Sequence, residues 1–79
     1  MMAGEADSNP FYLGYPGGMI VESIEVGGEG SEVLADVDAD GRIVGIEILD
    51  VNVPANVELA RRFADEHGLA FPPGAVPAA

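Results

Sequence analysis

Two runs rich in β-branched residues, separated by a short loop, constrain the fold of this chain more than any other feature. They are residues 32–38 and 42–49, and residues 39–41 between them read Ala-Asp-Gly. A loop of this kind, with glycine in the left-handed position, is typical of a β-hairpin. The residues expected to form the turn are Asp38, Asp40 and Gly41. The middle of the chain is therefore predicted to be a two-stranded hairpin.

The same stretch, residues 36–47, also matches the spacing of carboxylates and glycine in a calcium-binding EF-hand loop. Such a loop requires a helix on either side. Here five of the eight residues in 42–49 are isoleucine, valine or glycine, which are poor helix formers. In a hairpin, Glu47 lies several residues from the turn and is too far away to close a cage with Asp40. We therefore expect no metal site and no cofactor.

Two further strands are expected before the hairpin. Residues 10–15 place apolar side chains on one side of an extended segment, and residues 19–26 are rich in β-branched residues. Pro16-Gly17-Gly18 between them has the residue order that a type II turn prefers. Residues 27–30 read Gly-Gly-Glu-Gly but lack the helix start and lysine of a phosphate-binding loop. We interpret them as a hairpin loop.

The last third of the chain changes from the period of a strand to that of a helix. Val57, Ala60 and Ala64 lie on one helical stripe, which Leu59 and Phe63 widen. The helix is predicted to run from about residue 54 to residue 67, with a proline in its first turn and a glycine just past its end.

Together these elements predict an α+β fold, a four-stranded antiparallel β-meander with one C-terminal helix packed on one face. Residues 9–68 are expected to form a single domain, since 79 residues are enough for one small domain at most. Residues 1–8 are expected to be a lead-in, and residues 69–79 a proline-rich tail.

Residues 36–51, DVDADGRIVGIEILDV, closely resemble the core signature of domain-of-unknown-function family 2283, a group of small bacterial proteins. The pattern is an Asp-x-Asp strand end, an acidic-Gly turn and a Gly-Ile-Glu-Ile-Leu strand. Residues 6–15 and 20–26 extend the resemblance weakly over the first two strands. The resemblance implies a four-stranded antiparallel meander with a helix and no established activity. Because some relatives are encoded beside small basic toxin-like proteins, it also suggests an antitoxin-like role by association.

The predicted hairpin is apolar on both of its faces. The simplest register pairs Val37 with Ile43, Ala35 with Gly45 and Leu34 with Ile46. One face then carries Val33, Ala35, Val37, Ile43, Gly45 and Leu49. The other carries Leu34, Val44, Ile46 and Ile48, interrupted by Asp36.

A single helix can cover only one of these faces. We expect it on the first, where Ala35 and Gly45 leave a shallow trough for Phe63. The second face is then expected to be an exposed apolar patch, of the kind that marks an interaction site. The alternative is that the N-terminal strand or the C-terminal tail covers it.

The charge of the chain narrows the choice of partners. Fourteen acidic residues face three arginines and no lysine, which gives a formal net charge of −11. Such a surface repels phosphate backbones and anionic membranes, so neither nucleic acid nor membrane is an expected partner. A basic protein is the electrostatically natural partner, although surplus acid can also serve only to keep a small protein in solution.

The sequence offers little for catalysis, and we expect no catalytic residue. His67 is the only histidine and is expected to cap the helix or face solvent. Asp36 and Glu47 are the carboxylate pair closest to acid–base spacing, but the register above places them on opposite sides of the sheet. The chain is therefore not expected to be an enzyme.

Three functions are compatible with these features. The leading one is a non-enzymatic interaction module that self-associates or docks into a larger assembly. The second is an acidic antitoxin-like partner that neutralises a small basic protein. The third is an accessory subunit of a symmetric shell such as a viral capsid.

No apolar run approaches the ~20 residues of a membrane span, and the N-terminus lacks the basic start and apolar core of a secretory signal. The expected compartment is therefore the cytoplasm, or the virion for the shell subunit.

Overall fold

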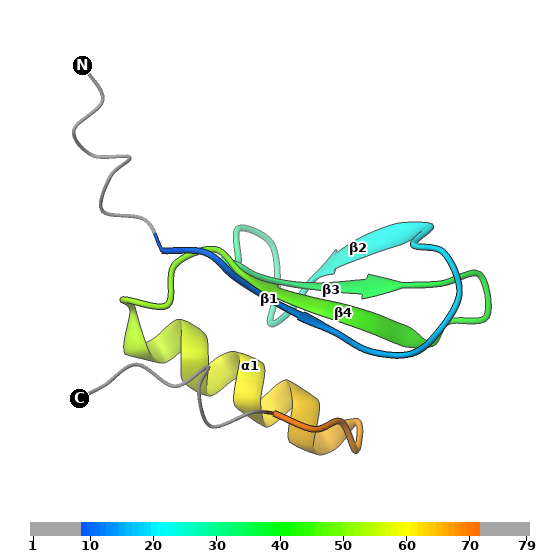
Figure 1. Ribbon diagram of the computed structural model, residues 1–79. Coiled ribbons are helices and arrows are strands. Elements are labelled where there is room, and N and C mark those ends of the chain that lie inside the picture. The colour runs from blue at the N-terminus through cyan, green and yellow to red at the C-terminus, as the bar shows by residue number, and fades with distance from the viewer. Residues whose placement is uncertain (1–8, 72–79) are drawn as a thin grey trace.

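The computed structural model describes residues 9–71, which form one antiparallel sheet and one helix (Figure 1). The strands are β1 (Phe11–Gly14), β2 (Glu22–Glu25), β3 (Val33–Val37) and β4 (Ile43–Ile48), and the helix is α1 (Pro54–Glu66). The predicted α+β class, with four antiparallel strands and a C-terminal helix, is confirmed. The predicted lead-in, 1–8, and residues 72–79 of the predicted tail lie outside the described residues.

The strand order is β1-β4-β3-β2, so the meander holds for β2, β3 and β4, and β1 pairs with β4. The segment between β1 and β2 therefore crosses the end of the sheet instead of closing a tight hairpin. A type II turn at Pro16-Gly17 would require a positive φ at Gly17, and Gly17 does not have one. The expected turn is wrong because it assumed that strands consecutive in sequence are neighbours in the sheet.

The β3–β4 hairpin contains a β-bulge that the simple register did not include. Val37 faces Ile43 as predicted, but Asp36 then faces Gly45, which leaves Val44 as the extra residue on β4. From there on Ala35 pairs with Ile46 and Leu34 with Glu47, not with Gly45 and Ile46. Since alternate residues of a strand point to opposite faces, this shift of one residue turns the rest of β4 over.

The bulge places two of the predicted interaction residues in the core. Ile46 and Ile48 are both 0% exposed and pack with the alanines of α1. Val44 is buried as well, and a Cβ on Gly17 would overlap its Cγ1, so the β1–β2 segment covers it. Leu34 is half-buried on the opposite face, across from Glu47. The prediction of an uncovered face made of Leu34, Val44, Ile46 and Ile48 is therefore wrong.

The helix follows the predicted pattern closely. Pro54 stands in its first turn, and its buried residues are Val57, Ala60 and Ala64. Two alanines on the buried stripe let the helix backbone approach β3 and β4 closely. The helix ends in a Schellman-type cap, in which Gly68 has a φ of +67° and the Leu69 N–H donates to Ala64 O at 2.8 Å.

The core lies between the sheet and α1. Its buried residues are Leu13, Val26, Val33, Ala35, Ile46, Ile48, Ala60 and Ala64. Leu69 and Phe71, from the segment expected to be a tail, pack against it, and Tyr15 Oη donates to Ala70 O at 2.6 Å. Within residues 9–71, α1 is the one helix, and it is neither long nor apolar enough to cross a membrane.

Candidate functional site

A polar cluster lies on the open face of the sheet, opposite α1. Tyr12 Oη donates to Asp36 Oδ2 at 3.1 Å, and Ser23 Oγ donates to Asp36 Oδ1 at 2.6 Å. Tyr12 is on β1, Asp36 on β3 and Ser23 on β2, so the tyrosine must reach across β4. It does so over Gly45, where a Cβ would overlap the phenol oxygen. Gly45 thus faces Tyr12, and the expected approach of Phe63 to Gly45 does not occur.

The register also brings Glu47 to this face, because Tyr12 pairs with Glu47 on β4. The expectation that Asp36 and Glu47 point to opposite sides is therefore wrong, again because of the bulge. Desolvation, the hydrogen bond to Asp36 and the charges of Asp36 and Glu47, in that order, raise the pKa of Tyr12 above its ordinary value. Tyr12 accordingly stays protonated at neutral pH and donates to a buried carboxylate. The cluster ties β1, β2 and β3 together across the open face.

Replacing Gly45 by alanine is expected to displace Tyr12 without disturbing the core, because the new methyl group would occupy the position of the phenol oxygen. The hydrogen bond to Asp36 would be lost, and the pKa of Tyr12 would fall towards the ordinary value of 10.0. Spectrophotometric titration of the variant in a Tyr15→Phe background measures Tyr12 alone, since the chain has two tyrosines.

Gly14→Ala is the matched control. Gly14 pairs with Gly45 across β1 and β4, but its Cβ would lie 3.8 Å from the Tyr12 ring, an ordinary contact. This variant should keep the raised pKa. An unchanged Tyr12 titration in the Gly45→Ala protein would show that the ring does not cross this position.

The turn residues form a second, structural cluster. Asp38 Oδ1 accepts the backbone N–H groups of Asp40 and Arg42, both at 2.9 Å. Its Oδ2 accepts the Gly18 N–H at 3.0 Å. Gly41 has a φ of +81° and donates its N–H to Asp38 O at 2.9 Å. Asp38 therefore holds both the β3–β4 turn and the segment that follows β1.

The segment that matched the spacing of a calcium loop, residues 36–47, contributes to both of these clusters. Asp36 binds two side-chain hydroxyls on the open face, and Asp38 binds three backbone N–H groups. In the part of the chain that the structure describes, no three histidine, cysteine, aspartate or glutamate side chains are grouped so that they could hold a metal ion.

An apolar groove lies between β2 and the C-terminal half of α1, and we call it the β2–α1 groove. Its volume is about 490 Å³. Its apolar lining residues are Ile24, Val26, Val37, Ile43, Leu59 and Phe63. Arg62, Glu66 and His67 stand at its helical rim, and the His67 ring packs on Phe63 with centroids 4.3 Å apart.

The groove exists because α1 is narrower than the sheet. The helix packs over β3 and β4, whereas β2 lies at the sheet edge away from it (Figure 1). Ile24 on β2 points to the same side as Ala35 but remains 45% exposed. The three residues before β2 are also apolar and exposed, and Met19 is 86% exposed. These exposed apolar residues are Met19, Ile20, Val21 and Ile24.

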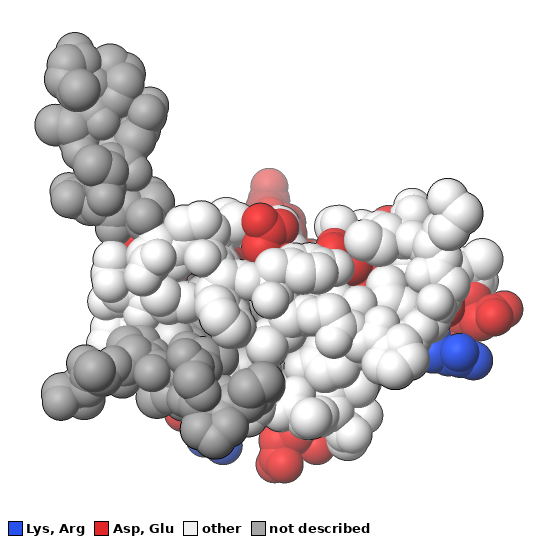
Figure 2. All heavy atoms as spheres, viewed as in Figure 1, with Lys and Arg blue, Asp and Glu red and all other residues white. Residues whose placement is uncertain are grey.

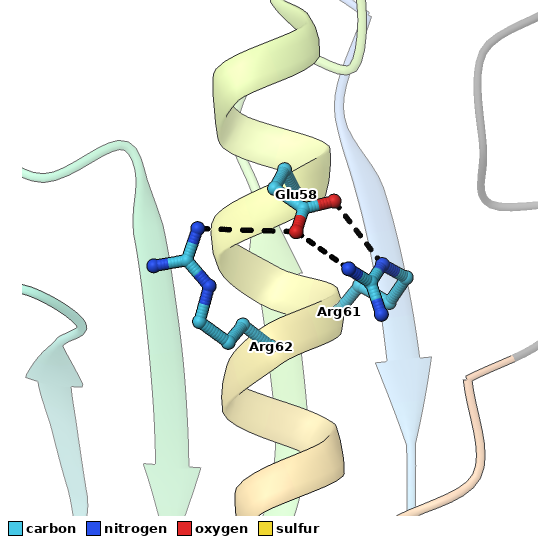
Figure 3. Close-up of polar contacts among 3 residues, drawn as sticks. All are labelled: Glu58, Arg61 and Arg62. Carbon is cyan, nitrogen blue, oxygen red and sulfur yellow. Dashed lines mark hydrogen bonds and ion pairs between the residues drawn. The ribbon is translucent and has the colours of Figure 1, made fainter.

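Charge around the groove is mostly negative. On the exposed side of α1, Glu58 binds Arg61 at 2.5 Å and Arg62 at 3.8 Å (Figure 3). These are two of the three arginines of the whole chain. The carboxylates of Glu22, Glu25 and Glu66 have no ion pair among the described residues. Figure 2 shows acidic side chains at several places on the surface, and basic ones only at its right and lower margins.

The groove was not predicted from the sequence, although one signal pointed towards it. The run Met19-Ile20-Val21 is apolar without alternation, and a strand with one buried face would alternate. The offset between helix and sheet that leaves the groove open depends on packing and leaves no local pattern.

Comparison with known families gives one match. The model of a family described as "Protein of unknown function (DUF2283)" matches residues 5–52, more than half of the chain. No curated protein and no solved structure matches the chain significantly.

Proposed function

Because the chain belongs to the DUF2283 family, whose function is unknown, its role has to be inferred from its own surface, and we propose that it is a non-enzymatic protein-interaction module. The β2–α1 groove is the docking surface. The observation that carries this proposal is that Ile24, which lines the groove, is 45% exposed, and that Met19, Ile20 and Val21 directly before β2 are exposed as well. Exposed apolar surface of this kind marks interaction sites in small proteins.

The size of the groove alone also fits a small ligand, since such pockets measure about 300–1,000 Å³. Two features favour a protein. The groove opens beside an edge strand, which offers backbone hydrogen-bonding groups to another chain. Exposed apolar residues also precede β2, at Met19, Ile20 and Val21, and they do not line the groove. A small ligand would use neither feature.

A different protein is favoured over a second copy as the partner. Val44, Ile46 and Ile48 of the face expected to support self-association are buried, and two copies would each bring a formal charge of −11. The same charge supports the second candidate function, neutralisation of a small basic protein in the manner of an antitoxin. It also disfavours nucleic acid and anionic membranes as partners. The shell-subunit function stays a prediction.

A photo-reactive amino acid in place of Ile24 tests the docking surface. Irradiation of the source cells should join the chain to a discrete partner, because the side chain at this position would lie inside the interface. The measurement is the mass and identity of the adduct after purification through a tag on the chain.

Leu49 is the matched control position. It is an exposed apolar residue just after β4, and it does not line the groove. The reagent at Leu49 should give no discrete adduct. If the adduct contains a second copy of the chain, the groove mediates self-association and the proposed different partner is wrong. Equal cross-linking at Ile24 and Leu49, or none at either position, would contradict the proposal.

A further inference from the structure

The outer edge of β2 presents backbone N–H groups beside the groove, whereas its Glu25 carbonyl accepts the Gly28 N–H at 3.4 Å. The Val26 N–H donates to Val33 O at 2.9 Å, and the register pairs Ile24 with Ala35. Because hydrogen-bonded and non-hydrogen-bonded pairs alternate in an antiparallel ladder, the backbone N–H groups of Ser23 and Glu25 point away from β3. They are the positions at which another strand could pair.

We infer that the partner supplies an extended segment, with alternating apolar and cationic residues, that pairs with β2 as a fifth strand. This inference rests on the proposed docking function and adds the conformation and chemistry of the occupant. Backbone pairing at a sheet edge provides affinity, and pockets for alternate side chains provide specificity.

The alternation follows from the two faces that a fifth strand would continue. On the helix side β2 carries Glu22 at its start and then Ile24. Side chains of the added strand next to Ile24 would lie against Leu59 and Phe63, in the apolar lining of the groove. Apolar side chains there would extend the core to the edge that α1 leaves uncovered.

On the open face the same strand would lie beside Ser23 and Glu25, next to the buried carboxylate of Asp36. The Glu25 carboxylate accepts the Gly30 N–H at 3.1 Å but has no ion pair among the described residues, and Arg61 and Arg62 both bind Glu58. Cationic side chains therefore fit this face. Residues of alternating character are therefore matched to both faces over Ser23, Ile24 and Glu25, the part of β2 that lies beside the groove.

The charges of β2 also disfavour pairing with a second copy. The strand reads Glu-Ser-Ile-Glu, and an antiparallel pair of two such strands would bring four glutamates into one short ribbon. Like charges across a strand pair are destabilising, and charged residues on an edge strand commonly prevent self-pairing. A cationic strand removes this repulsion.

Short capped peptides test the inference on the intact chain. A peptide of alternating valine and lysine should bind, and one of alternating valine and glutamate should bind at least about tenfold more weakly because of repulsion. Binding of the lysine peptide should weaken as salt is added. Hydrogen exchange of the Ser23 and Glu25 amides should slow on binding, whereas the amides of β1, at the other edge, should be unaffected.

Two variants at one position separate backbone pairing from charge. Glu25→Ala keeps the N–H and removes the carboxylate, and should weaken binding a few-fold. Glu25→Pro also removes the N–H, which points outwards and is not needed within the sheet, and should cost about a further tenfold. Circular dichroism checks that both variants fold, and the exchange experiment on the unmodified chain stands if one does not.

Equal binding of the two peptides, or no slowing at Ser23 and Glu25, would overturn the fifth-strand inference. If Ile24 still forms its cross-link in cells, docking at the groove stands and only the proposed conformation and chemistry of the partner fail. If Ile24 forms no cross-link, the docking function itself fails.

Discussion

Replacing Ile46 by aspartate is expected to unfold the protein. Ile46 is fully buried between the sheet and α1 and belongs to the same core as Ala60 and Ala64. Truncation of a buried isoleucine costs about 2–5 kcal/mol, and an unpaired buried carboxylate adds a desolvation cost. Since a small domain has about 5–15 kcal/mol of total stability, the sum is enough to abolish folding. Far-ultraviolet circular dichroism and urea unfolding of the purified variant measure the loss.

Ile24→Asp is the matched control, because it makes the same substitution at an isoleucine that is half exposed on β2. It should fold with nearly the stability of the original chain and lose only the binding of a partner at the β2–α1 groove. If the Ile46→Asp protein folds, β4 does not turn over at Val44, and the register without the bulge is the correct one. The two variants therefore test the bulge and the docking surface separately.

Replacing Asp38 by alanine is expected to give the second-largest loss of stability. Its carboxylate accepts three backbone N–H groups, from Asp40, Arg42 and Gly18. Removing it leaves these donors without their partner, both at the β3–β4 turn and in the segment after β1. Hydrogen bonds to a charged group are the stronger kind, so the melting temperature should fall by about 10 °C or more. Thermal unfolding followed by circular dichroism measures the difference.

Asp40→Ala is the control for this substitution. Asp40 lies in the same turn, but only its backbone N–H takes part in the hydrogen bonds around Asp38. Its removal changes the net charge equally and should leave the melting temperature almost unchanged. Equal melting temperatures for the two variants would show that the Asp38 carboxylate does not hold the turn.

The same carboxylate predicts how stability depends on pH. The backbone hydrogen bond from Gly18, followed by that from Arg42, lowers the pKa of Asp38 below its ordinary value of 3.8. The stability that Asp38 contributes is therefore fully present above the unfolded pKa, and it is lost as the pH falls through the lower, folded pKa. The melting temperature of the original chain should decline in this acidic range more steeply than that of Asp38→Ala.

Much of the architecture could be predicted because local signals agreed with one another. The turn Asp38–Gly41 combines a side chain that binds backbone N–H groups with a glycine at positive φ. For the helix, the sequence itself contains the signals: a proline at the start, the buried stripe of Val57, Ala60 and Ala64, and a glycine at the end. Each of these signals operates within a few residues, so it can be read without knowledge of the fold.

The candidate site could not be predicted in the same way. The polar cluster requires Tyr12, Asp36 and Ser23, from three strands whose order was not encoded locally. The groove requires the offset of α1 from β2, which is set by how the alanines of the helix pack on β3 and β4. Contacts between distant segments decide both features.

The amino-acid sequence by itself determined the hairpin turn, the helix with its buried stripe, the α+β class and the acidic surface. Only the tertiary structure decided which face of β4 is buried. Val44 is bulged, and the one-residue shift sends Ile46 and Ile48 into the core and leaves Gly45 beneath Tyr12. The physical reason is that a strand apolar on both faces carries no preference of its own for either register. Its orientation is set by which side chains the helix and the neighbouring strands can bury.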